Sequence, residues 1–230
     1  MLTPRDKTFL LKLKEQIVSN CKKCRGQDFR CSCLDTFRLE FKKVKANIAP
    51  KYRSMTLDDI THPQTTAVRS RIREYIENMD EHLEKGTGVF LFGSTGLAKT
   101  GIASILLMEA LKRRRTGYFT TLDQCVNLYA GGWKDEKIKE QYQDVILDTD
   151  VLVLDEVGNE ARTNTNLVGS CFNDVIRRRA NNLQTTIITS NLLFKKLKDV
   201  YGEEVHSILH ECTIPFEFSG VDFRQGIQSV

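Results

Sequence analysis

The stretch GSTGLAKTG, residues 93–101, follows the apolar run VFLF directly and continues into the helix-compatible segment GIASILLMEALKRRR. A glycine, four residues and then Gly-Lys-Ser/Thr form the usual phosphate-binding loop between a strand and a helix. In such a loop, backbone N–H groups surround the phosphates, the lysine adds a positive charge and the hydroxyl joins a Mg²⁺ shell. The sequence therefore predicts a nucleotide site. Its predicted residues are Gly93, Ser94, Thr95, Gly96, Leu97, Ala98, Lys99, Thr100 and Gly101.

One position of this loop departs from the pattern, because Ala98 stands where the second glycine belongs. Glycine is favoured there for its backbone freedom and because it lets a ligand approach closely. Alanine adds only a methyl group, so we expect altered loop geometry or weaker affinity rather than loss of binding. The alternative is a chance match that binds no ligand.

Polar residues end two further apolar runs. Asp155 and Glu156 close VLVLDEVG (151–158), where Asp155 could hold Mg²⁺ and Glu156 could polarise an attacking water. Asn191 closes TTIITSN (185–191) and could point its amide at the γ-phosphate or that water. The alternative interpretations are an acidic pair that only caps a turn and an asparagine that only begins a loop.

The second half of the chain alternates short apolar, β-branched runs with helical segments, which is typical of a mostly parallel sheet covered on both faces. We therefore predict an α/β fold with a parallel five-stranded sheet flanked by helices. The predicted strands are residues 88–93, 117–122, 150–158, 184–191 and 213–218.

The N-terminal part has a different character. CKKCRGQDFRCSC places Cys21, Cys24, Cys31 and Cys33 within thirteen residues, a spacing that suits four thiolate ligands of a structural zinc ion. The alternative is a set of reduced, unligated cysteines in a mobile arm. Cys125, Cys171 and Cys212 are expected to be small core residues rather than ligands.

Helical periodicity flanks the cysteines, with one predicted helix over residues 1–20 and another over residues 34–44. Pro50 stops the second helix, and a third begins after Pro63. We predict a zinc-binding region at 1–47, a linker at 48–62 and a nucleotide-binding domain at 63–230. Phe9, Phe37 and Phe41 either anchor a partner or pack on the zinc knuckle.

Composition and charge exclude several classes of protein. With 40% hydrophobic and 28% charged residues over 230 positions, the chain is neither disordered nor fibrous. A net charge of +4 permits a nucleic-acid partner without requiring one. No apolar run is long enough to span a bilayer, and the N-terminus lacks a signal-peptide core, so we expect no membrane association and a cytoplasmic location.

From residue 48 to about 226 the chain resembles the AAA+ ATPases, and within them the helicase loaders related to DnaC and DnaI and the transposition helper IstB. The resemblance implies a P-loop NTPase that uses ATP/ADP and Mg²⁺, with Thr100 and Asp155 at the metal. It also implies that Asp155 and Glu156 form the Walker B pair, Asn191 is sensor 1 and Arg224 approximates the sensor 2 arginine. The matching segments, in the family's order, are KYRSMTLDDI (51–60), GSTGLAKT, VLVLDEVG, TTIITSN, YGEEVHSIL (201–209) and SGVDFR (219–224).

Departures from the family pattern bear on the rate of hydrolysis. Family members usually carry arginines in the segment matching YGEEVHSIL, one of which reaches a neighbouring subunit, whereas this chain has Glu204 and Ile208 there. An arginine finger is worth several orders of magnitude in rate, so slow hydrolysis or use of ATP as a switch is expected. A slipped alignment would instead hide the finger in RRR (177–179).

These patterns predict an ATP-dependent loader that docks on a replicative hexameric, DnaB-type helicase and delivers it to single-stranded DNA, with ATP-dependent self-assembly. The alternatives are an IstB-like transposition ATPase and a non-hydrolysing helicase adaptor. Candidate DNA contacts are KRRR (112–115), RRR (177–179) and the aromatics Tyr129 and Trp133, with solvated helix ends as the alternative for the basic runs. Trp133 is expected to pack into the core.

Overall fold

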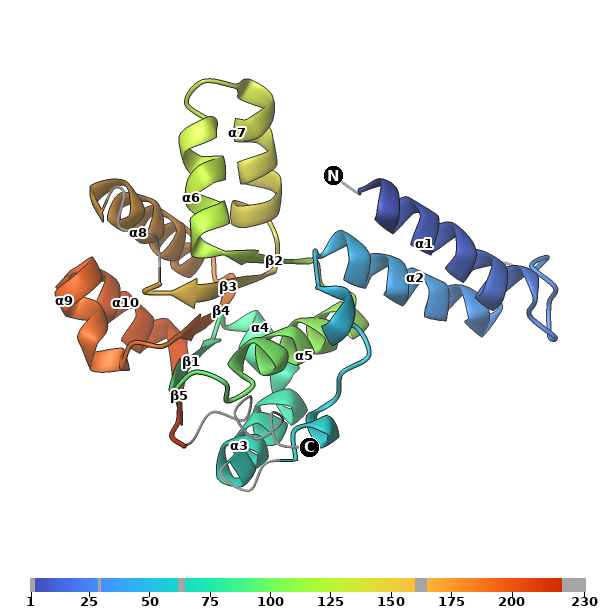
Figure 1. Ribbon diagram of the computed structural model, residues 1–230, viewed down its shortest axis with the longest axis horizontal. Coiled ribbons are helices and arrows are strands. Elements are labelled where there is room, and N and C mark those ends of the chain that lie inside the picture. The colour runs from blue at the N-terminus through green and yellow to red at the C-terminus, as the bar shows by residue number, and fades with distance from the viewer. Residues whose placement is uncertain (1–2, 29, 62–64, 160–164, 221–230) are drawn as a thin grey trace, which may run out of the picture.

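A parallel sheet lies at the centre of the protein, whose computed structural model describes residues 3–28, 30–61, 65–159 and 165–220 (Figure 1). The sheet has five strands in the order β2-β3-β4-β1-β5, and every neighbouring pair is parallel. Each strand lies within one residue of its predicted ends, so the predicted α/β fold is confirmed. The strands are β1 (Gly88–Gly93), β2 (Gly117–Thr121), β3 (Val151–Val157), β4 (Thr185–Ser190) and β5 (Thr213–Phe218).

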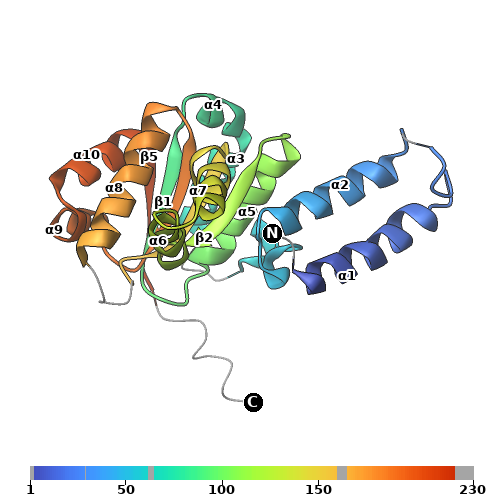
Figure 2. The ribbon, with the colours of Figure 1, turned by 90° about the horizontal axis from the view of Figure 1, so that it is seen from above.

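Helices cover both faces of this sheet, because successive strand side chains point to opposite sides. Val89 and Leu91 pack with α3 (Thr66–Glu77), α4 (Met79–Glu84) and α5 (Lys99–Lys112). Phe90 and Phe92 face the other layer, which Figure 2 shows on the opposite side of the sheet. That layer consists of α6 (Leu122–Gly131), α7 (Glu136–Tyr142), the π-turn Gln143–Leu147, α8 (Thr165–Asn181), α9 (Leu197–Tyr201) and α10 (Glu203–Cys212).

The N-terminal region is a pair of helices that projects from the α5 side of the sheet (Figures 1 and 2). The first, α1 (Pro4–Lys14), begins at a capping box of Thr3 and Asp6 and continues through a π-turn at Glu15–Ser19. The second, α2 (Ser32–Lys45), packs against that turn and against α5. Both predicted helices are therefore present, and no helix of the described ranges is long and apolar enough to cross a membrane.

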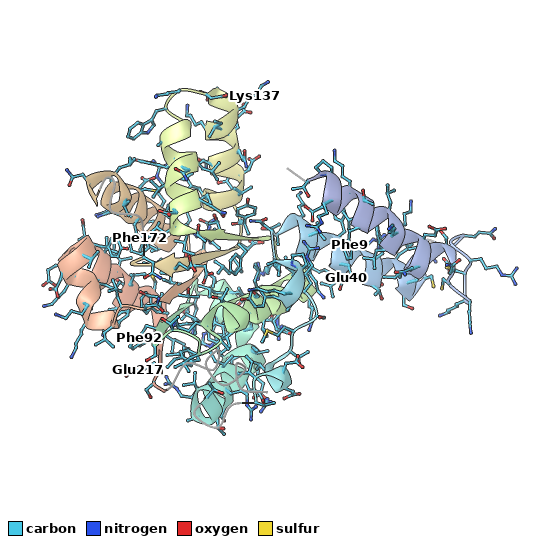
Figure 3. The ribbon with its side chains drawn as sticks, viewed as in Figure 1. Phe9, Glu40, Phe92, Lys137, Phe172 and Glu217 are labelled. Carbon is cyan, nitrogen blue, oxygen red and sulfur yellow. The ribbon has the colours of Figure 1, made fainter. Side chains whose placement is uncertain are left out.

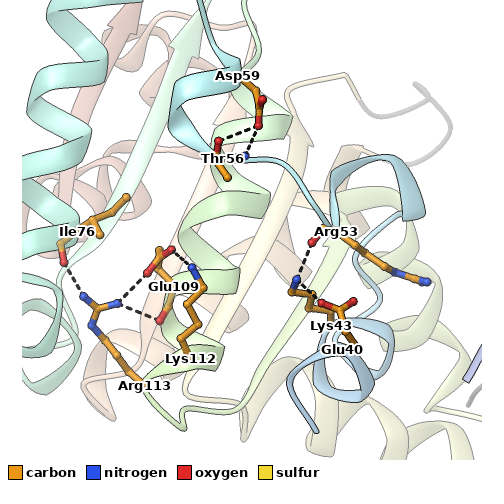
Figure 4. Close-up of polar contacts among 9 residues, drawn as sticks. All are labelled: Glu40, Lys43, Arg53, Thr56, Asp59, Ile76, Glu109, Lys112 and Arg113. Atoms are coloured by element: carbon orange, nitrogen blue, oxygen red, sulfur yellow. Dashed lines mark hydrogen bonds and ion pairs between the residues drawn. The ribbon is translucent and has the colours of Figure 1, made fainter. Parts of the chain in front are cut away.

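Residues 46–60, here called the strap, connect α2 to the domain that contains the sheet. Ala46, Ile48 and Ile60 are buried in the core on the α5 side of the sheet, so the predicted linker at 48–62 is packed at Ile48 and Ile60. Figure 4 shows how α2 holds it: Lys43 Nζ donates to the Arg53 carbonyl at 2.7 Å and to Glu40 at 2.6 Å. The strap also contains two short 3₁₀ helices, Pro50–Tyr52 and Leu57–Asp59. The domain boundary near residue 47 stays a prediction.

The basic run 177–179 does not form one exposed patch. Arg179 is 0% exposed, and its guanidinium donates to Thr186 Oγ1 at 3.0 Å. Burial lowers its pKa to about 9, which still leaves it protonated at neutral pH. Arg179 is therefore neither a DNA contact nor part of a solvated helix end, so both predictions are wrong for this residue. Its burial also excludes it as the hidden arginine finger. Its other acceptors are the carbonyls of Ile146, Thr149, Asp150 and Thr185, at 2.8 to 3.3 Å.

Replacing Arg179 by methionine is expected to lower the free energy of unfolding by at least about 3 kcal/mol, because several buried carbonyls would lose their donor together. Arg178→Met provides the matched control, since Arg178 is exposed and pairs with Asp174 at 2.8 Å. Its expected loss is below about 1 kcal/mol. Denaturant unfolding measures both, and equal losses in the two variants would contradict the structural role of Arg179.

Candidate functional site

Most of the predicted nucleotide residues line one cavity of about 440 Å³ at the carboxyl ends of β1, β3 and β4, and Gly93, Ser94 and Asp155 lie outside its lining. This is the edge at which parallel α/β sheets bind ligands. Glu156 and Asn191 reach the same cavity as the loop, although both are distant from it in sequence. The lining residues are Lys51, Tyr52, Met55, Thr95, Gly96, Leu97, Ala98, Lys99, Thr100, Gly101, Glu156, Asn159, Thr189, Ser190 and Asn191.

The loop begins at a glycine that no other residue could replace without movement of the backbone. Gly93 has φ 124°, and a Cβ built on it would lie 2.0 Å from the Phe218 carbonyl oxygen on β5. Lys99 is buried within the loop, where its Nζ donates to the carbonyls of Gly93 at 2.8 Å and Ser94 at 2.7 Å. The same ammonium donates to Asn191 Oδ1 at 3.0 Å. The lysine of the loop and the asparagine at the end of β4 are thus in direct contact.

Ala98 adopts the left-handed backbone conformation that its position in the loop requires. Its φ is 59° and its ψ is 16°, immediately before the first turn of α5. An L-residue other than glycine pays about 1–2 kcal/mol for this conformation. The alanine therefore adopts a conformation that glycine would adopt at lower cost, and the expectation of altered loop geometry or weaker affinity stays a prediction.

Ala98→Gly is expected to raise the free energy of unfolding by about 0.5–1 kcal/mol, which is the relief of the left-handed alanine less the greater chain entropy of glycine. We expect ATP affinity to stay equal or to increase. Ala130→Gly, within α6, should instead destabilise the protein by about 1 kcal/mol. Chemical denaturation and nucleotide titration test both variants, and destabilisation by Ala98→Gly would contradict the argument.

Of the acidic pair, Glu156 lines the cavity, and Asp155 lies beside it in contact with the lining residues Thr100 and Thr189. Asp155 is buried, and its Oδ1 accepts from Thr100 Oγ1 at 3.2 Å and from Thr189 Oγ1 at 2.5 Å. Burial raises the pKa of Asp155, while these two hydrogen bonds oppose that shift. Glu156 is exposed to the cavity. A hydroxyl beside a carboxylate supplies the hard oxygen ligands that Mg²⁺ prefers, so Thr100 and Asp155 fit that ion.

Sequence reasoning missed one wall of this cavity. Lys51, Tyr52 and Met55 of the strap line it, and a Cβ built on Gly101 would meet Met55 Sδ at 2.9 Å. The signal available was the segment KYRSMTLDDI, whose position ahead of the loop did not reveal that it folds back over α5. Arg224, the predicted sensor 2 arginine, lies outside the described residues.

The four N-terminal cysteines form one cluster, with all sulfurs within 4.8 Å of one another. The Sγ atoms of Cys21 and Cys31 lie 3.8 Å apart, and those of Cys24 and Cys33 lie 3.5 Å apart. A tetrahedral zinc–thiolate site with 2.3 Å bonds has sulfurs about 3.8 Å apart, so the cluster fits a zinc ion. Val18 and partly buried Phe37 pack around it.

The other three cysteines lie away from this cluster. Cys125 on α6 and Cys171 on α8 are buried with their sulfurs 3.9 Å apart, and Cys212 is half-buried at the end of α10. The hydrogen bond with the Cys171 thiol, together with burial, raises the pKa of Cys125 well above its usual value, which keeps that sulfur protonated. The expectation that Cys125 and Cys171 are core residues agrees with their burial.

The structure also places the predicted aromatic and basic DNA-contact candidates and Glu204. Trp133 is 67% exposed at the end of α6, so the expectation that it packs into the core is wrong. It lies in the turn between α6 and α7, and Figure 3 labels Lys137 of α7 at the outer end of this hairpin. In the run 112–115, Lys112 and Arg113 both pair with Glu109 (Figure 4). Glu204, at a position where the family resemblance implies an arginine, pairs with Arg177.

Comparison with known proteins adds a family to this geometry. Residues 36–214 match the family described as IstB-like ATP binding protein. The replicative helicase loader DnaI of Bacillus subtilis is 23% identical over 140 residues, which are 61% of this chain and 44% of that protein. This chain therefore spans less than half the length of that DnaI.

Two further relatives are matched over a larger share of their own length than DnaI is. The insertion sequence IS5376 putative ATP-binding protein of Geobacillus stearothermophilus is 25% identical over 187 residues, or 79% of this chain and 71% of that protein. The crystal structure of the DnaC helicase loader superposes with a TM-score of 0.64 and 26% identity, covering 74% of this chain and all of the other. The matched family segment begins at residue 36, so the four clustered cysteines lie ahead of it in the sequence.

Proposed function

Because the chain belongs to the IstB-like ATP-binding family, we propose that it is an ATP-dependent loader that docks on a replicative hexameric helicase and delivers it to single-stranded DNA. The observation that carries the ATP-dependent part is the single cavity shared by the phosphate loop, Glu156 and Asn191. The similarity to the DnaC and DnaI loaders supports the helicase as partner.

In this proposal the loop N–H groups and Lys99 hold the phosphates of ATP, and Thr100 and Asp155 hold Mg²⁺, which offsets phosphate charge when it is bound. Glu156 orients the attacking water, and Asn191 holds the γ-phosphate or that water. The sensor 2 role is assigned to Arg224 on the resemblance alone.

Hydrolysis is proposed to be slow, so that ATP acts mainly as a switch for self-assembly and DNA binding. Glu204 carries a negative charge where the family resemblance implies an arginine. Ile208 is apolar and packs against the core on the α8 and α10 side of the sheet. Neither side chain can stabilise charge on a neighbouring subunit's γ-phosphate, as an arginine finger does.

The helicase is proposed to dock on the N-terminal region, with zinc holding its fold. Leu11 on α1 is 70% exposed, and Phe9 and Phe41 are also exposed in part. Exposed aromatic and aliphatic side chains of this kind are the usual anchors of protein interfaces. Figure 3 shows Phe9 and Glu40 within this projecting pair of helices.

A second candidate function is that of a transposition ATPase, which the similarity to the IS5376 protein favours. The cysteine cluster argues for the loader, since it precedes the family segment and adds a region that can serve as a dedicated docking module. A non-hydrolysing helicase adaptor is the third possibility and is separated from the loader by its ATP dependence.

The test is capture of a purified replicative helicase by this protein with and without Mg²⁺-ATP, followed by transfer of the helicase to circular single-stranded DNA. Lys99→Ala removes the charge at the phosphate loop and should abolish ATP binding and helicase transfer. Lys195→Ala, an exposed lysine away from the cavity, is the control. ATP binding by Lys99→Ala at parental affinity would refute the site, and ATP-independent helicase binding without transfer would identify an adaptor.

A further inference from the structure

The two acidic residues of the site sit on an irregularity in the sheet. Regular pairing between β3 and β4 matches Leu154 with Ile188 and Val157 with Ser190. Between those pairs, Asp155 and Glu156 of β3 lie opposite Thr189 alone. One extra residue in a strand is a β-bulge, a feature that redirects side chains and is common beside active sites. Glu156 accordingly has φ 61°, in the left-handed region.

The hydroxyl of Thr189 bridges the two residues of this bulge. Its oxygen accepts from the Glu156 backbone N–H at 3.0 Å, and its proton is donated to Asp155 Oδ1 at 2.5 Å. The Thr189 side chain is buried, so water cannot take over these bonds readily. A single hydroxyl can serve both groups because it has one donor and two acceptor sites.

The direction of each bond matters for the site. Since the backbone of Glu156 is fixed at its N–H, its carboxylate leaves the sheet toward the cavity from a defined point. Asp155 also accepts from Thr100 Oγ1 at 3.2 Å, so the bond from Thr189 fixes which way that carboxylate faces. One β4 hydroxyl therefore sets the position of a residue that would orient water and of a residue that would hold Mg²⁺.

We propose that Thr189 is a positioning residue for ATP hydrolysis, acting through the bulge at Asp155 and Glu156. The proposal rests on the proposed ATPase function of this cavity. It adds a residue to the site that the phosphate loop, the acidic pair and Asn191 do not include.

The bulge has a second attachment that should keep the strands paired without Thr189. Ser190 Oγ donates to the Val157 carbonyl at 2.6 Å, just beyond the bulge. Loss of the Thr189 hydroxyl should therefore loosen Asp155 and Glu156 locally while β3 and β4 remain together.

Thr189→Val keeps the shape of the side chain and removes both hydrogen bonds. Its kcat should fall at least about tenfold, since displacement of catalytic groups by about 1 Å can cost about a hundredfold. The Mg²⁺ concentration needed for nucleotide binding should rise, whereas ATP affinity at saturating Mg²⁺ should stay within about threefold, because the loop is untouched. Thr189→Ser restores the hydroxyl and should return kcat and the Mg²⁺ requirement to near parental values.

Thr185→Val is the matched control on the same strand. Thr185 is equally buried, and its Oγ1 has no hydrogen-bond partner among the described residues. The control should therefore leave kcat and the Mg²⁺ titration unchanged. If the valine variant at 189 does not fold, Thr189→Ala replaces it in the same comparison, with unfolding midpoints recorded for every variant.

A double variant separates positioning from general weakening of the fold. If Thr189 acts through Glu156, Thr189→Val should add little to the loss of kcat caused by Glu156→Gln. Parental kcat and Mg²⁺ requirement in Thr189→Val, or equal impairment in Thr189→Ser, would overturn the proposal while an active parent and an inactive Glu156→Gln left the proposed function standing. A parent that bound no ATP would instead overturn the proposed function and this inference with it.

Discussion

Cys24→Ser is expected to abolish zinc retention and to unfold the N-terminal region while the sheet domain stays folded. Among the described residues from 3 to 45, the buried apolar side chains apart from two of the cysteines are those of Leu10, Val18 and Val44. So small a core cannot fold without a metal, and structural zinc contributes about 10–16 kcal/mol in comparable small domains. Serine removes one thiolate of four, so the site becomes incomplete.

Zinc per chain, measured by atomic emission on protein purified under reducing conditions, should be one for the parent and near zero for Cys24→Ser. Limited proteolysis should then cut within the first 45 or so residues and leave the remainder intact. Cys212→Ser is the control because Cys212 lies at the end of α10, outside the cluster. A parent without zinc, or a Cys24→Ser variant that kept one zinc per chain, would contradict the prediction.

The strands and the phosphate loop could be predicted because their signals are local. A short apolar, β-branched run predicts a buried strand on its own, and the loop motif has fixed spacing. The bulge could not be predicted in this way, since it depends on the register between β3 and β4. The sequence TTIITSN directed attention to Asn191, although Thr189 within it makes the contacts with Asp155 and Glu156.

Charge and aromatic patterns were less informative because burial depends on tertiary neighbours. Arg177, Arg178 and Arg179 are consecutive, yet the third is buried and donates to carbonyls of two separate segments, residues 146–150 and β4. Trp133 follows a glycine pair and was expected in the core, but it lies at the end of α6, beyond the reach of the sheet's apolar face. Local periodicity carries no information on which helix end is covered.

The strap illustrates the same limit at the site itself. Pro50 predicts correctly that α2 ends before it, since α2 stops at Lys45. Nothing local to the strap indicates that Tyr52 and Met55 then form a wall of the nucleotide cavity. The packing of Met55 on Gly101 brings together positions that are distant in the chain.

Glu156→Gln is expected to lower ATP turnover by about 10²–10⁴-fold, the range typical for loss of a general base, with little change in ATP affinity. Glu156 is exposed to the cavity, whereas Lys99 donates to loop carbonyls and to Asn191, and Thr100 donates to Asp155. Its carboxylate would thus act on the attacking water, a role confined to the transition state. Glutamine keeps the size of the side chain and removes the negative charge that polarises that water.

Single-turnover hydrolysis of ATP, with affinity measured by titration of a fluorescent ATP analogue, separates these effects. Turnover should fall while the dissociation constant stays within about threefold, since binding relies on Lys99, Thr100 and Asp155. Glu84→Gln is the control, because Glu84 is exposed at the end of α4 and does not line the cavity. This variant should behave as the parent. Parental turnover in Glu156→Gln would assign the base to another residue. Weaker binding with unchanged turnover would instead place Glu156 among the groups that hold the nucleotide.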